Sequence, residues 1–386
     1  MSATGRPDES TPQASDIAVD LLDAGLVRLV ADATGDAVAA AGLLTNALES
    51  NGVAHQTSVV ALAEPAERAT DADLTVSLGR PSVDADAVFG VDGTPASETA
   101  LSVAATLGSP DYELALAGSY AADTPPGSDL LATASEHGLE RRPGIGVPTS
   151  EFADGLAHSS LVHAPFSGST DAASEALASA GVAETVSGDH ADETHQLVAS
   201  MVALAVCEDE QSTPRAAETL ERFLRPLATP DGRFETVEGY ADVLDATARE
   251  QPGLAVPLAL DAVDSSTPLD VWRQHTTRAH DAVRSAATAR YGGLFVVQCD
   301  ATAPLGTVAR LVRDFRSPEP LVLAVADGKA AAAATRKHAE THTSVGSLVS
   351  ETATAVGGVG SGTMTRGRAR FDGNPTEFVG TFREAL

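Results

Sequence analysis

Four aspartates follow short apolar runs that we expect to be strands: Asp32, Asp36, Asp92 and Asp123. In a parallel sheet the carboxyl ends of the strands meet at one edge, so these carboxylates would converge there. Clustered carboxylates need a cation, and Mg²⁺ and Mn²⁺ prefer oxygen ligands. Two such ions could activate water for attack on a phosphodiester. None of the ten histidines lies beside these aspartates, however, although hydrolytic sites of this kind usually need them.

The first two aspartates could have a structural role and take no part in metal binding. Asp32 ends an apolar run and Asp36 opens a long Ala/Leu-rich segment. Carboxylates at such positions can simply cap the following helix and complement its dipole. Position alone favours this structural role.

A second candidate site is a glycine-rich run followed by a basic segment with an alternating pattern. Its members are Gly357, Gly358, Gly360, Gly362, Thr363, Arg366, Arg368 and Arg370. Backbone N–H groups without side chains around them can form an anion-binding nest, and the arginines could then contact phosphate. The run lacks the G-x-G-x-x-G spacing of a dinucleotide fingerprint. Taken alone, it is better explained as a flexible loop before an edge strand.

Several other kinds of active site are excluded because the sequence lacks their motifs. His338 and His342 are four residues apart, but Glu340 is not adjacent to either histidine as a zinc protease requires. The chain has no G-x-S-x-G elbow and no Walker A sequence, so the serine-hydrolase and P-loop classes do not apply.

The elements that must position these residues alternate between strand and helix over residues 16–123. We expect strands near 26–31, 53–60, 74–78, 87–91 and 113–118, and helices over 36–48 and 97–107. This alternation predicts an α/β fold with a doubly wound, mostly parallel sheet. Residues 291–386 contain two further apolar strands, at 294–299 and 321–326, around a helix at 305–314.

The predicted organisation has four parts. Residues 1–15 are a disordered tail, 16–205 the first α/β domain, 206–290 a helical connecting region and 291–386 a smaller α/β domain. No apolar run is long enough to cross a membrane, and no signal peptide is present, so we expect a cytoplasmic protein.

The composition indicates a protein adapted to concentrated salt. The formal charge is −29 with 43% hydrophobic residues, and Lys329 and Lys337 are the only lysines among 386 residues. Residues 310–386 nevertheless carry ten Lys or Arg against eight Asp or Glu, whereas residues 1–309 carry 15 against 46. A near-neutral end on a very acidic chain indicates either an anion-facing surface or a small domain that needs fewer surface acids. Cys207 and Cys299 are expected to be reduced, structural thiols.

With these residues in view, the chain resembles the DHH phosphoesterase superfamily, specifically the archaeal RecJ-like nucleases. Residues 30–35 are similar to the first motif of that family, His-x-Asp-x-Asp-Gly. Residues 87–94 fall where the Asp-His-His signature belongs, and residues 114–123 look like the strand ending in the last metal-binding aspartate. The end of the chain resembles the DHH-associated domain with its glycine-rich stretch. The resemblance covers most of residues 20–386.

The departures from the family pattern bear on function. Valine, threonine or glycine stands at five motif positions that hold a histidine or aspartate in the family: Val30, Thr34, Gly93, Thr94 and Thr363. The aspartates that remain are Asp32, Asp92 and Asp123, too few to ligate two metal ions. We therefore expect no intact catalytic site and no cofactor, with Mn²⁺ or Mg²⁺ needed only if activity is retained.

The resemblance then implies a non-catalytic subunit of DNA replication or repair that binds single-stranded DNA or RNA, or serves as a scaffold. Degenerate members of this family act in the replicative helicase assembly, so partners of the GINS or helicase type are implied. Two alternatives remain open at this stage. One is an active Mn²⁺-dependent exonuclease or phosphodiesterase with a reduced site around Asp32, Asp36 and Asp123. The other is a pure protein-interaction subunit.

Overall fold

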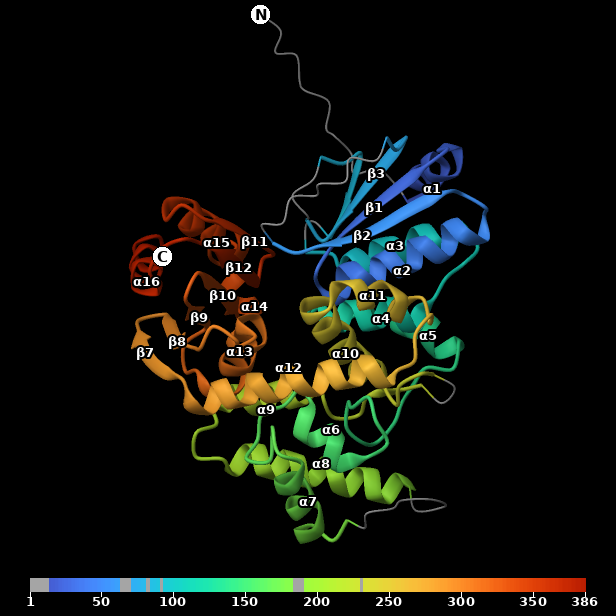
Figure 1. The fold of residues 1–386 in the computed structure, drawn as a ribbon. Helices are drawn as coiled ribbons and strands as arrows, with labels where there is room; N and C mark the ends of the chain where they lie inside the picture. The colour runs from blue at the N-terminus through green and yellow to red at the C-terminus, as the bar shows by residue number, and fades with distance from the viewer. Residues whose placement is uncertain (1–13, 63–70, 81–83, 91–92, 183–190, 230–231) are drawn as a thin grey trace, which may run out of the picture.

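The chain builds two separate sheets with a helical region between them (Figure 1). The computed structural model describes residues 14–62, 71–80, 84–90, 93–182, 191–229 and 232–386. Most of the predicted tail, and Asp92 of the candidate site, therefore lie outside the described residues. The last two residues of that predicted tail, Ala14 and Ser15, begin helix α1 (Ala14–Asp23).

The first sheet has four parallel strands in the order β2-β1-β3-β4. Its strands are β1 (Val27–Asp32), β2 (His55–Val60), β3 (Leu74–Leu78) and β4 (Ala87–Phe89). Strand β1 is central and almost wholly buried, as its continuous apolar run requires. The predicted parallel sheet is confirmed.

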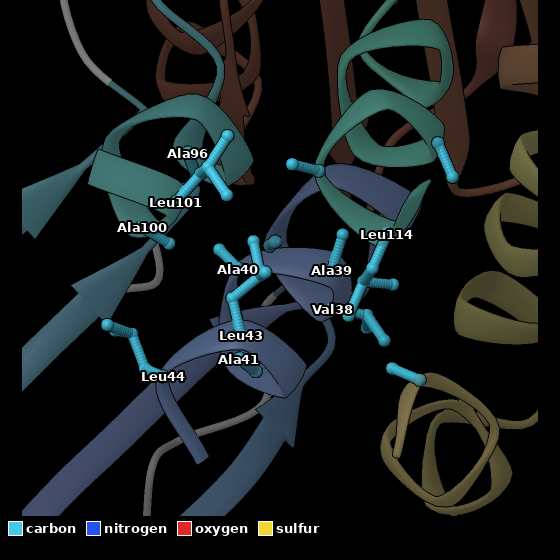
Figure 2. Close-up of a cluster of buried hydrophobic side chains, with 14 of the residues drawn as sticks. Val38, Ala39, Ala40, Ala41, Leu43, Leu44, Ala96, Ala100, Leu101 and Leu114 are labelled. Carbon is cyan, nitrogen blue, oxygen red and sulfur yellow. The ribbon is translucent and has the colours of Figure 1, made fainter. Parts of the chain in front are cut away.

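Three helices pack in the apolar core of the first sheet. They are α2 (Gly35–Ser50), α3 (Ala96–Thr106) and α4 (Tyr112–Ala121). Helix α2 is buried nearly all round, and Thr34 caps its first turn by accepting a hydrogen bond from Ala37 N–H at 3.4 Å. Figure 2 shows small and branched side chains of α2 interleaved with those of α3 and with Leu114 of α4. Alanine lets these helices approach closely.

The predicted strand at 113–118 is wrong, because this segment lies inside helix α4. Asp111 begins the helix by accepting a hydrogen bond from Leu114 N–H at 3.0 Å. The helix packs against α2, α3 and helix α10 (Val237–Glu250), so it is apolar on every side. A helix buried all round shows the same continuous apolar run as a buried strand, and the run alone cannot separate the two. Asp123 therefore follows a helix.

The middle of the chain is mainly helical, from residue 128 and not only over the predicted connecting region 206–290. Its helices are α5 (Ser128–Glu136), α6 (Phe152–His158), α7 (Thr170–Ser179), α8 (Ala191–Glu208), α9 (Pro214–Leu220), α10, α11 (Pro252–Ala259) and α12 (Ser266–Ser285). A short ladder joins β5 (Glu140–Arg141) to β6 (Leu227–Ala228). Helices α10 and α11 share the apolar core of α2, while α12 runs across the molecule toward the second sheet (Figure 1).

The second sheet has six strands in the order β11-β12-β10-β9-β8-β7 and is antiparallel except between β8 and β9. Its strands are β7 (Ala287–Tyr291), β8 (Leu294–Gln298), β9 (Leu321–Ala326), β10 (Lys329–Ala334), β11 (Val359–Gly362) and β12 (Arg366–Arg370). Its helical elements are α13 (Leu305–Leu311), the π-helical turn η1 (Val312–Arg316), α14 (Arg336–Ala339), α15 (Val345–Ala355) and α16 (Pro375–Glu384). The predicted C-terminal α/β domain is confirmed. Among the described helices, none combines the length and apolarity needed to cross a membrane.

Candidate functional site

Asp32 is the last residue of β1, at the carboxyl edge of the first sheet. Its Oδ1 accepts hydrogen bonds from Ala33 N–H at 2.9 Å and from the guanidinium of Arg368 on β12. The side chain of Asp32 is only 10% exposed, and that of Arg368 is 24% exposed. Burial raises the pKa of Asp32, while the Arg368 guanidinium acts in the opposite direction. A cation from the C-terminal domain therefore occupies the position expected for a metal ion.

Asp36 lies in the first turn of α2 but serves a different helix. Its two oxygens accept hydrogen bonds from Ala96 N–H at 2.8 Å and Ser97 N–H at 2.9 Å. These are the first two amides of α3, which have no partner within their own helix. The structure thus uses Asp36 to cap α3, and both carboxylate oxygens are engaged in doing so.

Asp123 lies just beyond the C-terminus of α4, in a left-handed conformation with φ of 60°. Its Oδ2 is 2.8 Å from Arg313 Nη2 and 3.4 Å from Arg366 Nη2, and Oδ1 accepts a hydrogen bond from Arg222. Burial alone would raise the pKa of Asp123, but Arg313, Arg222 and Arg366 together hold it well below its usual range. This second aspartate is thus surrounded by guanidinium groups.

A second carboxylate completes this cluster. Asp314 accepts from Arg313 Nε at 2.7 Å and pairs with Arg222 as well. Arg222 and Arg313 therefore bridge Asp123 of the first domain to Asp314 of the turn after α13. These ion pairs connect the two halves of the molecule and hold the halves against each other.

Helix α10 adds a further pair of charges beside Asp32. Asp245 accepts from Gly35 N–H at 2.9 Å, so it caps the start of α2, and Arg249 Nε donates to Asp245 at 2.8 Å. A Cβ at Gly35 would lie 2.7 Å from Ala121 Cβ, so only glycine permits this close approach of α2 to the end of α4. Asp245 and Arg249 were not among the residues singled out from the sequence.

The glycine run has a packing role. Gly357 has φ of 76° and ends α15, and Gly358 N–H donates to Ala353 O at 2.7 Å. A Cβ at Gly360 would lie 2.7 Å from Ser350 Cα, so this glycine lets α15 lie directly on β11. The amides of Gly357, Gly358 and Thr363 all donate to carbonyl oxygens of the protein.

The three arginines of β12 have separate surroundings. Arg366 Nη1 donates to Ala121 O at 2.8 Å in addition to its pairing with Asp123. Arg368 is bound to Asp32. Arg370 is exposed at the end of the strand. Two of the three arginines expected to face phosphate are thus directed at carboxylates of the first domain.

The donor atoms present do not fit a two-metal centre. In the described part of the chain, no group of three or more His, Cys, Asp or Glu side chains is placed to hold a metal ion. Asp32 and Asp123 belong to separate arginine-paired groups, and Asp36 is used as a cap. Guanidinium groups bind Oδ1 of Asp32 and both oxygens of Asp123, where they compete with any cation.

A cavity of about 1090 Å³ lies between the two domains, beside Asp123. Nine cationic and seven carboxylate side chains line it, in a chain whose formal charge is −29. The cations include Arg310, Arg336 and Lys337 from the C-terminal half. The cavity is therefore the most cationic place that the candidate site offers.

Sequence reasoning missed most of the arginines in this site. Arg222 comes from the flank of α9, and Arg310 and Arg313 come from the helix after β8, all far in sequence from Asp123. The one available signal was the three-residue spacing of Arg310 and Arg313, which places both on one side of a helix in an acidic chain.

A four-stranded parallel domain facing a C-terminal mixed sheet across this cavity is the DHH/RecJ-like fold. The chain is similar to the crystal structure of CDC45 from Entamoeba histolytica, with a TM-score of 0.56 and 11% identity over 96% of this chain and 98% of that one. It is also similar to RecJ in complex with Mn²⁺ from Thermus thermophilus, with a TM-score of 0.48 and 14% identity over 96% and 54%. At 11% identity the likeness to CDC45 concerns the fold.

Sequence similarity gives the family itself. The chain is 48% identical over 390 residues to the Haloarcula marismortui protein described as "Uncharacterized protein rrnAC1427", with 100% of both chains covered. A family described as "Uncharacterized protein rrnAC1427, C-terminal domain" matches residues 286–384. The chain belongs to the rrnAC1427 family.

Proposed function

We propose that this protein is a non-catalytic subunit of a DNA replication or repair assembly, which binds single-stranded nucleic acid or acts as a scaffold. The observation that carries the proposal is the pairing of Asp32 with Arg368 and of Asp123 with Arg313. A guanidinium supplies positive charge and hydrogen-bond donors, but it cannot coordinate and activate a water molecule as a metal ion does. The two-domain arrangement is kept while its hydrolytic chemistry is replaced.

Cationic side chains around the cavity support the nucleic-acid part of the proposal. Arg336 and Lys337 line it, and Arg370 is exposed at the end of β12. Such side chains contact the phosphate backbone without reading sequence. Aromatic residues make up only 4% of the chain, so base stacking contributes little and phosphate contacts carry the affinity. The implied partners are single-stranded DNA or RNA and replication proteins of the GINS or helicase type.

The test uses residues that take no part in the arginine–carboxylate pairs. Fluorescence anisotropy with labelled single-stranded DNA and RNA, in high salt, should show binding by the wild type and at least tenfold weaker binding by an Arg336→Ala/Lys337→Ala/Arg370→Ala variant. Arg142→Ala is the matched control, because Arg142 is exposed and outside the cavity. Equal binding by all three proteins overturns the nucleic-acid part of the proposal.

The scaffolding part has its own readout. A pull-down from nuclease-treated lysate of the source cells should recover replication or repair proteins, identified by mass spectrometry. Recovery without any strand binding in the anisotropy assay assigns the protein to pure protein interaction. Recovery of neither class removes the replication role.

The contacts of the three candidate aspartates do not support the alternative of a working exonuclease or phosphodiesterase. That alternative requires Asp32, Asp36 and Asp123 to share a cation. Asp36 instead binds two backbone amides of α3, and the other two carboxylates bind arginines.

A further inference from the structure

Strand β7 leaves one edge of the second sheet open. It is the last strand in the order β11-β12-β10-β9-β8-β7, and among the described strands it pairs with β8 alone. Its residues 287–290 are exposed. In Figure 1 it lies on the outer side of this sheet, whereas β12, which carries Arg368, faces the first domain. Another chain can therefore approach β7 without entering the cavity between the domains.

The other sheet edges in the described part of the chain are covered or short. Helix α15 packs along β11, and helix α11 packs against β2. Strand β4 has three residues, and β5 and β6 have two each. Strand β7 has five residues and neither the lysine nor the proline that commonly protects an exposed edge. Its one charged side chain, that of Arg290, is paired with Glu319 of the same chain.

The register of the sheet shows which backbone groups of β7 point outward. Cys299 N–H donates to Val325 O of β9 at 2.8 Å, so the odd-numbered residues of β8 direct their peptide groups toward β9. The even-numbered residues, one of which opposes Ala289, then direct theirs toward β7. Peptide groups alternate along a strand, so the N–H and C=O groups of Thr288 and Arg290 point away from the sheet. Each copy of the chain thus presents two donors and two acceptors along this edge.

The same segment is free of carboxylates. Residues 286–298 contain Arg290 and no Asp or Glu, although the whole chain has 54 acidic residues and a formal charge of −29. Surfaces covered with carboxylates repel each other, so most faces of two such chains are poorly suited to meet. Two copies of β7 bring no carboxylates together, and a basic partner would find none on this strand. The charge pattern therefore favours a second copy of this chain as the neighbour.

We infer that β7 pairs with β7 of a second copy, antiparallel, about a two-fold axis at Ala289. Thr288 of each copy then opposes Arg290 of the other, and the outward amides and carbonyls of these residues form reciprocal hydrogen bonds. The two Ala289 side chains form the close, non-hydrogen-bonded pair on the axis, where a small side chain fits. The two six-stranded sheets become continuous. Because five-residue strands make a small interface, the dimer is reversible and its population depends on protein concentration.

Sedimentation equilibrium in concentrated KCl, over a range of protein concentrations, measures this association. The wild type should show a monomer–dimer equilibrium. Thr288→Pro removes an outward N–H and leaves the hydrogen bonds to β8 in place, so it should dimerise at least tenfold more weakly. Thr288→Val is the matched control, because it keeps the N–H and the β-branched shape, and it should dimerise as the wild type does. Circular dichroism checks that both variants are folded.

Disulfide cross-linking tests the register without a proline. The background is Cys207→Ser, which removes the exposed native thiol. Ala289→Cys should give a cross-linked dimer under mild oxidation, because residues opposed in a non-hydrogen-bonded pair lie within disulfide range. Thr288→Cys is the matched control and should cross-link at least tenfold less, since its side chain opposes Arg290.

Three results would overturn the inference. They are a wild type that stays monomeric at every concentration, a folded Thr288→Pro variant that dimerises as tightly as the wild type, and equal cross-linking by the two cysteine variants. None of these measurements involves nucleic acid or a replication protein, so the proposed function stands or falls separately.

Discussion

The guanidinium of Arg368 donates to the carboxylate of Asp32, although the two residues are 336 positions apart in the chain. Asp32 ends the central strand of the first sheet, and Arg368 lies on β12 of the second. The contact joins the two domains at an aspartate that the sequence analysis offered as a metal ligand. Asp123 is likewise paired with an arginine, Arg313.

Arg368→Gln should therefore destabilise the protein. The substitution leaves Asp32, whose side chain is 10% exposed, without its cation. Loss of one partner of a largely buried pair costs a few kcal/mol, and the partial exposure of Arg368 places the expected loss at about 2 kcal/mol. Urea unfolding followed by circular dichroism measures it.

The control for this pair is a double-mutant cycle. Asp32→Asn/Arg368→Gln should be less destabilised than the sum of the two single variants, because the double variant leaves no unpaired charge. Strict additivity would mean that the two side chains do not interact in solution.

Asp123→Asn should be more harmful than the loss of Arg368. The carboxylate of Asp123 is shared by Arg222, Arg313 and Arg366, so its removal leaves an excess of positive charge among them. We expect a loss of about 3 kcal/mol at pH 7, measured by urea unfolding. Asp372→Asn, at an exposed position, is the control and should be nearly neutral.

The pH dependence of this effect has a definite sign. Because the pKa of Asp123 is held well below its usual range, its contribution is complete above about pH 4 and is lost as the pH falls further. The gap between wild type and Asp123→Asn should therefore narrow in acid. A gap that is constant from pH 7 down to pH 3 contradicts the pairing.

Glu238 gives a pH dependence of the opposite sign. Burial raises the pKa of Glu238 to about 7, and its Oε2 accepts from Leu227 N–H at 3.0 Å. A raised pKa means that the folded state favours the protonated form, so stability is greatest below about pH 4.5 and falls as the pH rises through 7. Glu238→Gln keeps an acceptor for Leu227 and should be more stable than the wild type at pH 8, by on the order of 2 kcal/mol. Urea unfolding at pH 5 and pH 8 checks this. If the free energy of unfolding changes equally between the two pH values in both proteins, the prediction is refuted.

Local patterns in the sequence were enough to predict the strands and most of the helices of the first domain. The apolar run ending at Asp32, and the Ala-rich segment after it, predict a strand and a buried helix because each depends on neighbours a few residues away. Helix α4 was misread because it is buried on every side, and its N-cap at Asp111 was the signal that would have corrected it.

The partners of the aspartates depend on long-range contacts. Arg313 meets Asp123 across 190 residues, and no spacing rule connects them. The sequence raised the expectation of an incomplete metal site at Val30 and Thr34, but no local pattern indicated that arginines pair with Asp32 and Asp123. Among the patterns in the sequence, the excess of Lys and Arg over Asp and Glu in residues 310–386 pointed to this part of the chain as the source of the cations.

Two glycine-to-alanine substitutions, in separate helices, test whether the segment before Asp123 is a helix. A Cβ at Gly118 in α4 would lie 2.4 Å from Ser97 Cβ, whereas Gly380 in α16 has open space around it. Gly118→Ala should destabilise by about 2 kcal/mol through overpacking, and Gly380→Ala should stabilise by up to about 1 kcal/mol through helix propensity. Thermal unfolding measures both. If Gly118→Ala is as stable as Gly380→Ala, the packing of α4 against α3 is wrong.

Arginines, and not metal ions, are the partners of Asp32 and Asp123. Calorimetric titration of Mn²⁺ into the purified protein in high salt tests this most directly, with an Asp32→Asn/Asp123→Asn variant as the reference. Both proteins should give the same weak, unsaturable heats, which come from surface carboxylates alone. A saturable Mn²⁺ isotherm in the wild type that is lost in the variant, with Mn²⁺-dependent cleavage of single-stranded DNA, would contradict it.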